Sequence, residues 1–191
     1  MTPEIAIFAR WPEPGKAKTR LIPALGAEGA AKLYAKLLEV TVREARASGL
    51  PFHLRVTGDD PARFRDWLGD DLNVRGQGDG DLGEKLARVP IPGLMIGSDC
   101  PGLTAALLRE AADALATHEA VIGPADDGGY WLLGLREPCR DLFTGMAWST
   151  PQVFPETMRR LDALGTVPHL LPKLTDIDTG EDLAAWPELL A

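Results

Sequence analysis

The sequence contains only two cysteines, Cys100 and Cys139, among its 191 residues. Two thiols are too few for a disulfide framework or a cysteine metal cage, so both classes of structure are excluded. No apolar run approaches the roughly 18 residues that a membrane span requires. The first residues, MTPEIAIFARWP, have no basic region ahead of a long apolar stretch, unlike a secretion signal. We therefore expect a cytoplasmic protein with reduced thiols and no membrane partner.

The sequence also has no excess of basic over acidic residues. The formal net charge is −8 and the calculated pI is about 4.9. A chain of this charge repels phosphate backbones and anionic lipid, so nucleic acid is not expected as a partner. The length suits a single domain over residues 1–191, because the sequence shows no linker, repeat or low-complexity segment. The sequence leaves the oligomeric state open.

Short apolar runs alternate with stretches of helical periodicity along the chain. The runs predict strands, and the periodic stretches predict helices. Strands are expected over 4–9, 52–56, 94–96, 120–123, 130–135 and 167–171, and helices over 27–48, 61–68, 105–117 and from Thr150 onward. This alternation predicts a three-layer α/β domain with a mostly parallel sheet.

The central stretch 93–103, GLMIGSDCPGL, presents a carboxylate directly after a short buried strand. Open α/β sheets bind ligands at the carboxyl ends of their strands, which is where Asp99 is expected. An anionic ligand there would need a divalent cation between itself and Asp99. Asp99 could instead cap the following helix, but Thr104 already occupies the capping position. The pattern favours a metal ligand.

A proline-rich and basic loop follows the first strand. Pro12, Pro14 and Gly15 prevent regular structure there, and the loop then presents basic residues at alternate positions. The residues at alternate positions are Lys16, Lys18 and Arg20, and Arg10 opens the loop. If the segment is extended, the three residues at alternate positions point to one side about 6–7 Å apart, which suits two phosphates. The loop is not a Walker A motif, because it lacks the Ser or Thr after Lys16.

Three further segments offer candidate ligand contacts. The glycine-rich stretch 76–83 contains a GxGxxG match, but its two aspartates would repel a pyrophosphate, and Asp81 with Glu84 forms a capping box instead. Its glycines allow a ligand to approach the backbone closely, next to Gln77 and Gly78.

The turn 124–129 presents Asp126 and Asp127, which lie where they could reach a ligand. The spacing of Asp176 and Asp178 leaves open whether either completes a cation site with Asp99 or whether the segment only caps the last helix.

Several segments together resemble a known family along nearly the whole chain. They are FARWPEPGKAKTRL, IGSDCPGL, GPADDGGYWLLGL, WST and DIDTGEDL. The chain resembles the GT-A-type, nucleotide-diphosphosugar-transferase-like family of formerly unknown function, some members of which are labelled arsenosugar-biosynthesis glycosyltransferases. It is also similar to molybdenum-cofactor and phospholactate guanylyltransferases, which share the AKTRL-type loop. The resemblance implies a Rossmann-like GT-A fold.

The resemblance also implies roles for individual residues. Asp99 corresponds to the metal-binding aspartate of the GT-A "DxD" site, although Ser98-Asp99-Cys100 supplies only one carboxylate here. In related nucleotidyltransferases a second ligand lies five residues before the Leu of the last helix, and that position is Asp178. This implies Mg²⁺ or Mn²⁺ bound by Asp99 and Asp178.

These observations support a leading hypothesis and two alternatives. The leading one is a metal-dependent glycosyltransferase with a nucleotide-diphosphosugar donor and a small-molecule acceptor. The basic loop would bind the diphosphate, Gln77 and Gly78 the base or ribose, and the 126–130 and 148–150 loops would face the acceptor. The alternatives are a nucleotidyltransferase that releases pyrophosphate from an NTP, and a non-catalytic nucleotide-binding protein.

Overall fold

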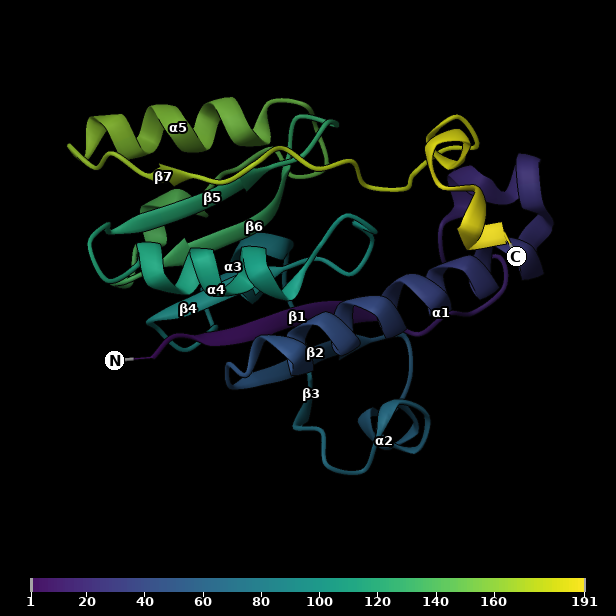
Figure 1. Cartoon of the computed structure of the whole chain (residues 1–191). Helices are drawn as coiled ribbons and strands as arrows, with labels where there is room; N and C mark the ends of the chain where they lie inside the picture. Colours follow the sequence, from purple (N-terminus) through teal and green to yellow (C-terminus); the bar gives the residue numbers. More distant parts are fainter. Residues whose placement is uncertain (1, 191) are drawn as a thin grey trace.

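The computed structural model describes residues 2–190. Within this range seven strands form one sheet in the order β3-β2-β1-β4-β6-β5-β7 (Figure 1). The strands are β1 (Glu4–Arg10), β2 (Phe52–Thr57), β3 (Val74–Gly76), β4 (Gly93–Ile96), β5 (Ala120–Pro124), β6 (Tyr130–Leu135) and β7 (His169–Leu170). Strand β6 runs antiparallel to β4 and β5, and all other paired strands are parallel. The prediction of a mostly parallel sheet is confirmed.

Helices cover both faces of the sheet, as expected for three layers (Figure 1). The α-helices are α1 (Ile22–Ser48), α2 (Pro61–Leu68), α3 (Leu82–Leu86), α4 (Ala105–Ala114) and α5 (Val153–Ala163). Short 3-10 helices are η1 (Thr19–Leu21), η2 (Arg140–Leu142), η3 (Asp182–Ala185) and η4 (Pro187–Leu190). In residues 2–190, no helix has both the length and the apolar character needed to cross a bilayer.

Alternate residues of each central strand enter different cores. In β1, Ile5 and Ile7 pack with α1, α2 and α4, whereas Ala6 packs with α3, η2 and α5. In β4, Leu94 and Ile96 belong to the first core, and Met95 belongs to the second. Because both faces are buried, these strands appear in the sequence as unbroken apolar runs.

Helix boundaries differ from the prediction where proline and glycine set the local geometry. Helix α1 begins at Ile22 but is interrupted at Gly26, whose φ of 71° is not helical, so regular helix resumes close to the predicted residue 27. Helix α5 has Gln152 rather than Thr150 at its N-cap. Its early Pro155 is tolerated because the first turn of a helix needs no backbone N–H donor. The last predicted helix is only the 3-10 helices η3 and η4.

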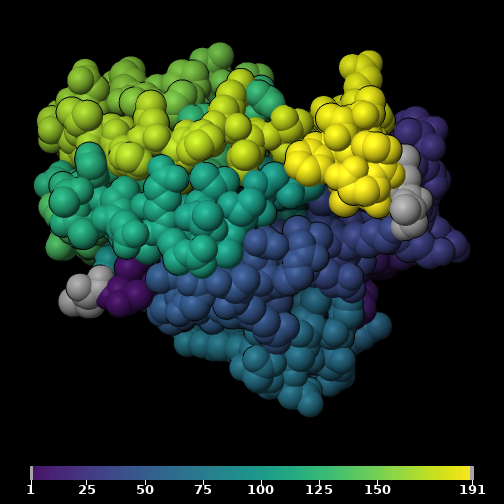
Figure 2. All heavy atoms as spheres, viewed as in Figure 1, coloured from purple at the N-terminus to yellow at the C-terminus, as the bar shows by residue number. Residues whose placement is uncertain are grey.

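The C-terminal segment crosses the molecule after β7 and packs against the start of α1 (Figures 1 and 2). Ile177 is fully buried there, in a small core that it shares with Leu21 and Leu37. The backbone N–H of Ile177 also donates to the carbonyl of Asp99 at 3.0 Å. This packing brings residues 176–178 beside the loop after β1 and the loop after β4.

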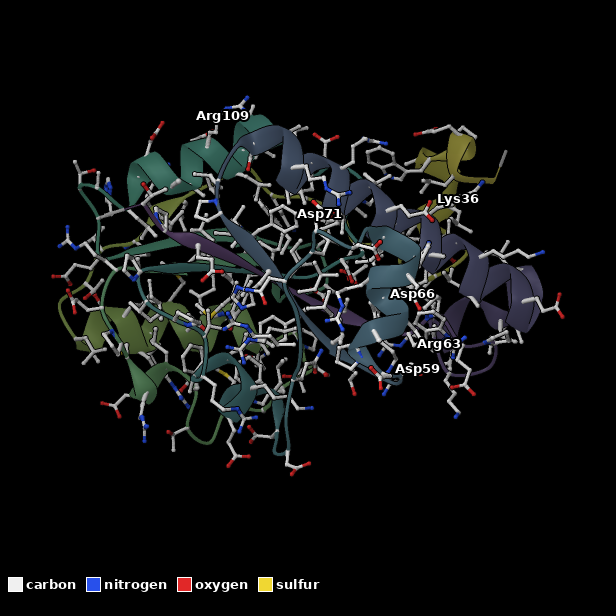
Figure 3. All side chains as sticks on the ribbon, turned by 90° about the horizontal axis from the view of Figure 1, so that it is seen from below. Lys36, Asp59, Arg63, Asp66, Asp71 and Arg109 are labelled. Carbon is white, nitrogen blue, oxygen red and sulfur yellow. The ribbon has the colours of Figure 1, made fainter. Side chains whose placement is uncertain are left out.

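The loop after β1 is anchored on helix α2. The ring of Trp11 lies edge-on to Phe64 at 5.1 Å and to Trp67 at 5.7 Å, so it packs instead of facing a ligand. The guanidinium of Arg63 covers the same indole at 4.3 Å. Arg63 and the exposed Asp66 lie on α2 in Figure 3. These contacts fix one end of the basic loop.

The close contact between β5 and β6 yields a stability prediction. A Cβ at Gly123 would lie 2.2 Å from the Trp131 indole, whose Nε1–H donates to Pro172 O at 3.1 Å and which is 4% exposed. Because the indole is held in place, Gly123→Ala should cost about 2–3 kcal/mol in the free energy of unfolding, measured with urea. The control is Gly76→Ala at the end of β3, where a Cβ meets nothing within 4 Å. Equal losses in both variants would contradict this reading.

Candidate active site

Three carboxylates converge at the carboxyl ends of β1 and β4. Asp99 follows β4, while Asp176 and Asp178 flank the buried Ile177 in the C-terminal segment. One oxygen of each carboxylate lies within 4.8 Å of the others. This acid cluster (Asp99, Asp176 and Asp178) is a set of hard oxygen donors of the kind that Mg²⁺ and Mn²⁺ prefer. Spacing alone left open whether Asp176, Asp178 or both join Asp99 or only cap the last helix, and the structure places both beside Asp99.

A buried ammonium group lies against this cluster. Lys18 Nζ donates to Asp99 Oδ2 at 2.9 Å and to Asp178 Oδ1 at 2.6 Å, and its side chain is only 9% exposed. Burial alone would lower the pKa of Lys18, but the Asp99 and Asp178 carboxylates outweigh it and hold the pKa well above its ordinary value. Arg20 donates from the solvent side to Asp178 Oδ2 at 3.1 Å. Lys18 is therefore a permanent cation at this edge of the sheet.

The basic loop is not extended, so the condition under which its three basic side chains would share one side is not met. Gly15 has φ of 80°, Lys18 is left-handed with φ of 47°, and the chain then enters η1. Because alternate side chains do not share one side in this geometry, Lys16 points elsewhere and pairs with Glu13 at 3.0 Å. The Arg10 guanidinium donates to the Lys16 carbonyl at 3.1 Å.

The acid cluster and the basic side chains line one cavity of about 530 Å³, here called the charged chamber. Its walls are Arg10, Lys18, Thr19, Arg20, Asp99, Asp127, Ser149, Asp176 and Asp178. Lys16 does not line it. Carboxylates and three cationic side chains around one cavity suit a metal-bound polyphosphate.

The two aspartates of the β5–β6 turn have different surroundings. Asp127 lines the charged chamber, and its Oδ1 accepts from the Gly129 N–H at 2.7 Å. Asp126 instead accepts from Thr175 Oγ1 at 2.6 Å and pairs with Lys173 Nζ at 2.7 Å, which lowers its pKa. Asp126 thus fastens the turn to the C-terminal segment, and Asp127 faces the cleft.

Gln77 attaches the glycine-rich loop to the sheet. Its side-chain amide donates to Ala9 O at 3.0 Å and to Arg55 O at 3.1 Å. Gln77 also lines a groove of about 210 Å³ that includes Arg10 and Asp99, whereas Gly78 does not. Gly78 has φ of 74°, a conformation that glycine adopts without strain. Gln77 is therefore placed beside the charged chamber, and Gly78 shapes the loop.

The sequence did not reveal a hydroxyl pair beneath Asp99. Tyr34 Oη lies 2.8 Å from Ser98 Oγ and accepts from the Arg10 N–H at 3.0 Å, while Ser98 Oγ donates to Phe8 O at 3.1 Å. These bonds fasten the end of β4 to the end of β1 and so fix the position of Asp99. Tyr34 lies on the buried face of α1, where the helical pattern predicts only packing. The only feature of the sequence that pointed to this contact was the serine directly before Asp99.

Comparison with known proteins agrees with this architecture. Residues 41–150, more than half of the chain, match the model of a family described as an uncharacterized protein conserved in bacteria, DUF2064. The chain belongs to this family. No curated protein is similar enough to count as a match.

Solved structures show the same fold. A candidate nucleotide-diphospho-sugar transferase from Desulfovibrio desulfuricans G20 is 31% identical, with a TM-score of 0.88 over 96% of this chain and 85% of that one. A 4-diphosphocytidyl-2C-methyl-D-erythritol synthase from Anaerococcus prevotii DSM 20548 is 13% identical, with a TM-score of 0.62 over 98% of both chains. Rv0371c of Mycobacterium tuberculosis H37Rv, in complex with manganese, is 18% identical, with a TM-score of 0.59 over 99% of this chain and 98% of that one. The expected nucleotide-diphosphosugar-transferase-like fold is confirmed.

The acid cluster predicts a pH-dependent effect on stability. Burial, with the nearby charges of Asp127, Asp99 and Asp178, raises the pKa of Asp176 to about 6. The raised folded-state pKa favours the protonated form, so the stabilising contribution is complete below pH ~4 and is lost as the pH rises through 6. At pH 8 the free energy of unfolding of Asp176→Asn should therefore exceed that of the parent by about 1 kcal/mol, after discounting for partial exposure. Near pH 4 the two proteins should be equally stable.

Urea unfolding with a chelator present at both pH values measures this difference. The matched control is Asp66→Asn on the exposed surface of α2 (Figure 3), which should show no such pH dependence. A parent protein as stable as Asp176→Asn at pH 8 would refute the prediction.

Proposed function

We propose that this protein is a divalent-cation-dependent transferase that uses a nucleotide-diphosphosugar donor. The observation that carries the proposal is the charged chamber, in which the acid cluster faces Arg10, Lys18 and Arg20. A carboxylate cluster alone repels a diphosphate, and a basic cluster alone has no place for a metal. Both together suit a nucleoside diphosphate bound through a cation.

The acid cluster fits Mg²⁺ or Mn²⁺ because three carboxylate oxygens approach one another without thiol or imidazole ligands among them. When bound, the cation would act as a Lewis acid on the diphosphate oxygens. Asp99 and Asp178 are the proposed principal ligands, with Asp176 as a third. The manganese complex of the distantly related Rv0371c is consistent with such a site.

The basic side chains would stabilise the leaving group. As the bond from the sugar carbon to the diphosphate breaks, its electron pair leaves with the diphosphate, and Lys18 and Arg20 neutralise the growing charge. Lys16 was predicted to share this role, but its contact with Glu13 and its position outside the chamber give it a smaller part. Gln77, with Gly78 shaping its loop, would face the base or ribose.

Asp127 is the proposed proton acceptor. It lines the charged chamber but lies outside the acid cluster, so its carboxylate is not committed to the cation. An acceptor hydroxyl that attacks the sugar carbon would lose its proton to Asp127. Asp126, predicted to act beside it, would position the turn through Thr175 and Lys173.

A nucleotidyltransferase is the second candidate. The same metal and cations could hold an NTP for attack at the α-phosphate, and a distant structural neighbour is named as a 4-diphosphocytidyl-2C-methyl-D-erythritol synthase. An NTP brings a third phosphate, however, and the residues around the cations are carboxylates. Because an NTP carries more negative charge than a nucleotide-diphosphosugar, these carboxylates would repel it more strongly, which favours the sugar donor. A nucleotide-binding protein without catalysis remains the third outcome of the tests.

A ligand panel tests the function directly. With Mn²⁺ present, a UDP-, GDP- or other NDP-sugar should raise the melting temperature more than the free NTP of the same base, because the chamber accommodates the smaller negative charge. Asp99→Ala should remove the Mn²⁺-dependent part of this shift. Preference for an NTP, with pyrophosphate released on adding an alcohol, would establish the nucleotidyltransferase instead. Metal-linked binding without turnover for any acceptor would establish the non-catalytic protein.

A pair of basic-loop variants tests the phosphate contacts. Arg20→Ala should weaken nucleoside diphosphate binding about tenfold, because a charge-assisted hydrogen bond contributes about 1.5–3 kcal/mol. Lys16→Ala removes the same charge from the same loop but outside the chamber, and should weaken binding less than about threefold at physiological salt. Calorimetric titration with UDP or GDP measures both. Equal losses for the two variants would mean that the loop attracts anions only through its overall charge.

A further inference from the structure

The cleft continues beyond the acid cluster into a second cavity of about 200 Å³, here called the aromatic chamber. Its walls are Leu82, Gly97, Asp99, Cys100, Ala125, Asp127, Gly129, Tyr130, Trp131, Trp148, Ser149, Thr150, Val153 and Asp176. Four of these residues, Asp99, Asp127, Ser149 and Asp176, also line the charged chamber. A molecule in one chamber is therefore in reach of a molecule in the other.

The two chambers differ in charge. The charged chamber holds Arg10, Lys18 and Arg20, whereas no Lys, Arg or His among residues 2–190 lines the aromatic chamber. Its charged groups are the carboxylates of Asp99, Asp127 and Asp176. A cation held by the acid cluster would offset Asp99 and Asp176, but Asp127 lies outside that cluster. No side chain of the aromatic chamber offers a counter-ion to an acidic ligand.

The aromatic walls are held in place from behind. Trp131 donates its Nε1–H to Pro172 O at 3.1 Å and is 4% exposed. Trp148 stacks on the buried Phe143 with 6.5 Å between ring centroids, and a Cβ at Gly83 would lie 3.0 Å from its Nε1. One face of the Trp148 indole thus has support, and its ring also borders the chamber. An aromatic surface fixed in this way binds a ligand without a large loss of side-chain entropy.

The loops that carry these walls are joined to each other. Phe154 N–H donates to Gly128 O at 2.9 Å, and a Cβ at Gly128 would lie 2.5 Å from Pro151 O. Ser149, at the junction of the two chambers, has φ of 61°, which is unfavourable for serine. Strained residues persist where surrounding contacts impose them, often at ligand sites. The chamber is therefore preformed.

Neutral sugar-like groups match these walls. Hydroxyls donate hydrogen bonds to carboxylates, which only accept, and the C–H face of a sugar ring packs on an indole. A phosphate or carboxylate would face Asp127 without a partner. The volume is below the roughly 300–1,000 Å³ of sites for drug-sized ligands, which indicates a group of about one ring.

We propose that the aromatic chamber binds a neutral, hydroxyl-bearing group of about monosaccharide size on Trp148 and rejects its phosphorylated or carboxylated analogues. This inference deepens the proposed function and rests on it for the identity of the neighbouring ligand. The bound group is either the sugar of the donor or a separate polyol acceptor, and both have the same chemistry.

Matched pairs of neutral and acidic ligands test the proposal in the presence of Mn²⁺. The donor arm compares UDP-glucose with UDP-glucuronate and GDP-mannose with GDP-mannuronate by calorimetry. The free-sugar arm compares glucose with glucuronate and glucose 6-phosphate by ligand-observed NMR, with and without the nucleoside diphosphate. We expect the neutral member to bind at least about tenfold more tightly in one arm, and that arm identifies the source of the group. No preference for the neutral member in either arm overturns the proposal.

Variants assign the preference to the chamber. Trp148→Ala should weaken binding of the preferred neutral ligand about tenfold while leaving UDP and GDP binding unchanged, and Trp148→Phe should restore most of the loss. Asp127→Asn should reduce the discrimination against the acidic member. Unchanged neutral-ligand binding in Trp148→Ala overturns the proposal. If no nucleoside diphosphate binds the parent protein, the proposed function fails, and the free-sugar arm without nucleotide still decides the chamber.

Discussion

The ammonium group of Lys18 joins the three parts of the chain that build the site. Its contacts with Asp99 and Asp178 connect residues 81 and 160 positions apart in the sequence. A buried lysine is stable only where carboxylates compensate its charge, and a carboxylate pair this close together needs a cation between its members. The loop after β1, the end of β4 and the C-terminal segment therefore depend on one another electrostatically, and the cleft takes its shape from that dependence.

Around this contact the cleft separates by charge into two connected spaces. Cationic side chains line the charged chamber, aromatic side chains line the aromatic chamber, and Asp127 lines both. Such a division would suit the transfer reaction proposed above, because the group that leaves with negative charge and the group that attacks require different surroundings. The ends of β1 and β4 border the charged chamber, and the β5–β6 turn places Asp127 at both chambers.

The sequence predicted the parts of this architecture that depend on burial and topology. Strands β1 and β4 are buried on both faces, so their apolar runs were visible in the sequence, and Asp99 lies where the end of a buried strand must place it. The conformation of the basic loop was not predictable, because a left-handed Lys18 follows from tertiary contacts with Asp99 and Asp178 rather than from local preference. Asp126 and Asp127 are chemically identical neighbours, and only the contacts of Asp126 with Lys173 and Thr175 separate their roles. The Tyr34–Ser98 pair joins two elements that no sequence pattern relates.

Because the C-terminal segment follows the last strand, the chain can contain every strand of the sheet and still lack part of the acid cluster. All strands of the described sheet lie before Leu171, whereas two of the three carboxylates of the acid cluster come after it. During synthesis the ribosome therefore releases every strand before it releases Asp176 and Asp178. A chain shortened by proteolysis just after Leu174 would retain the full set of strands and lose Asp176 as well as Asp178, which compensates the charge of Lys18 together with Asp99. Such a chain would lack two of the three carboxylates that are proposed to bind a cation, so cation binding would report whether the C-terminal segment is intact.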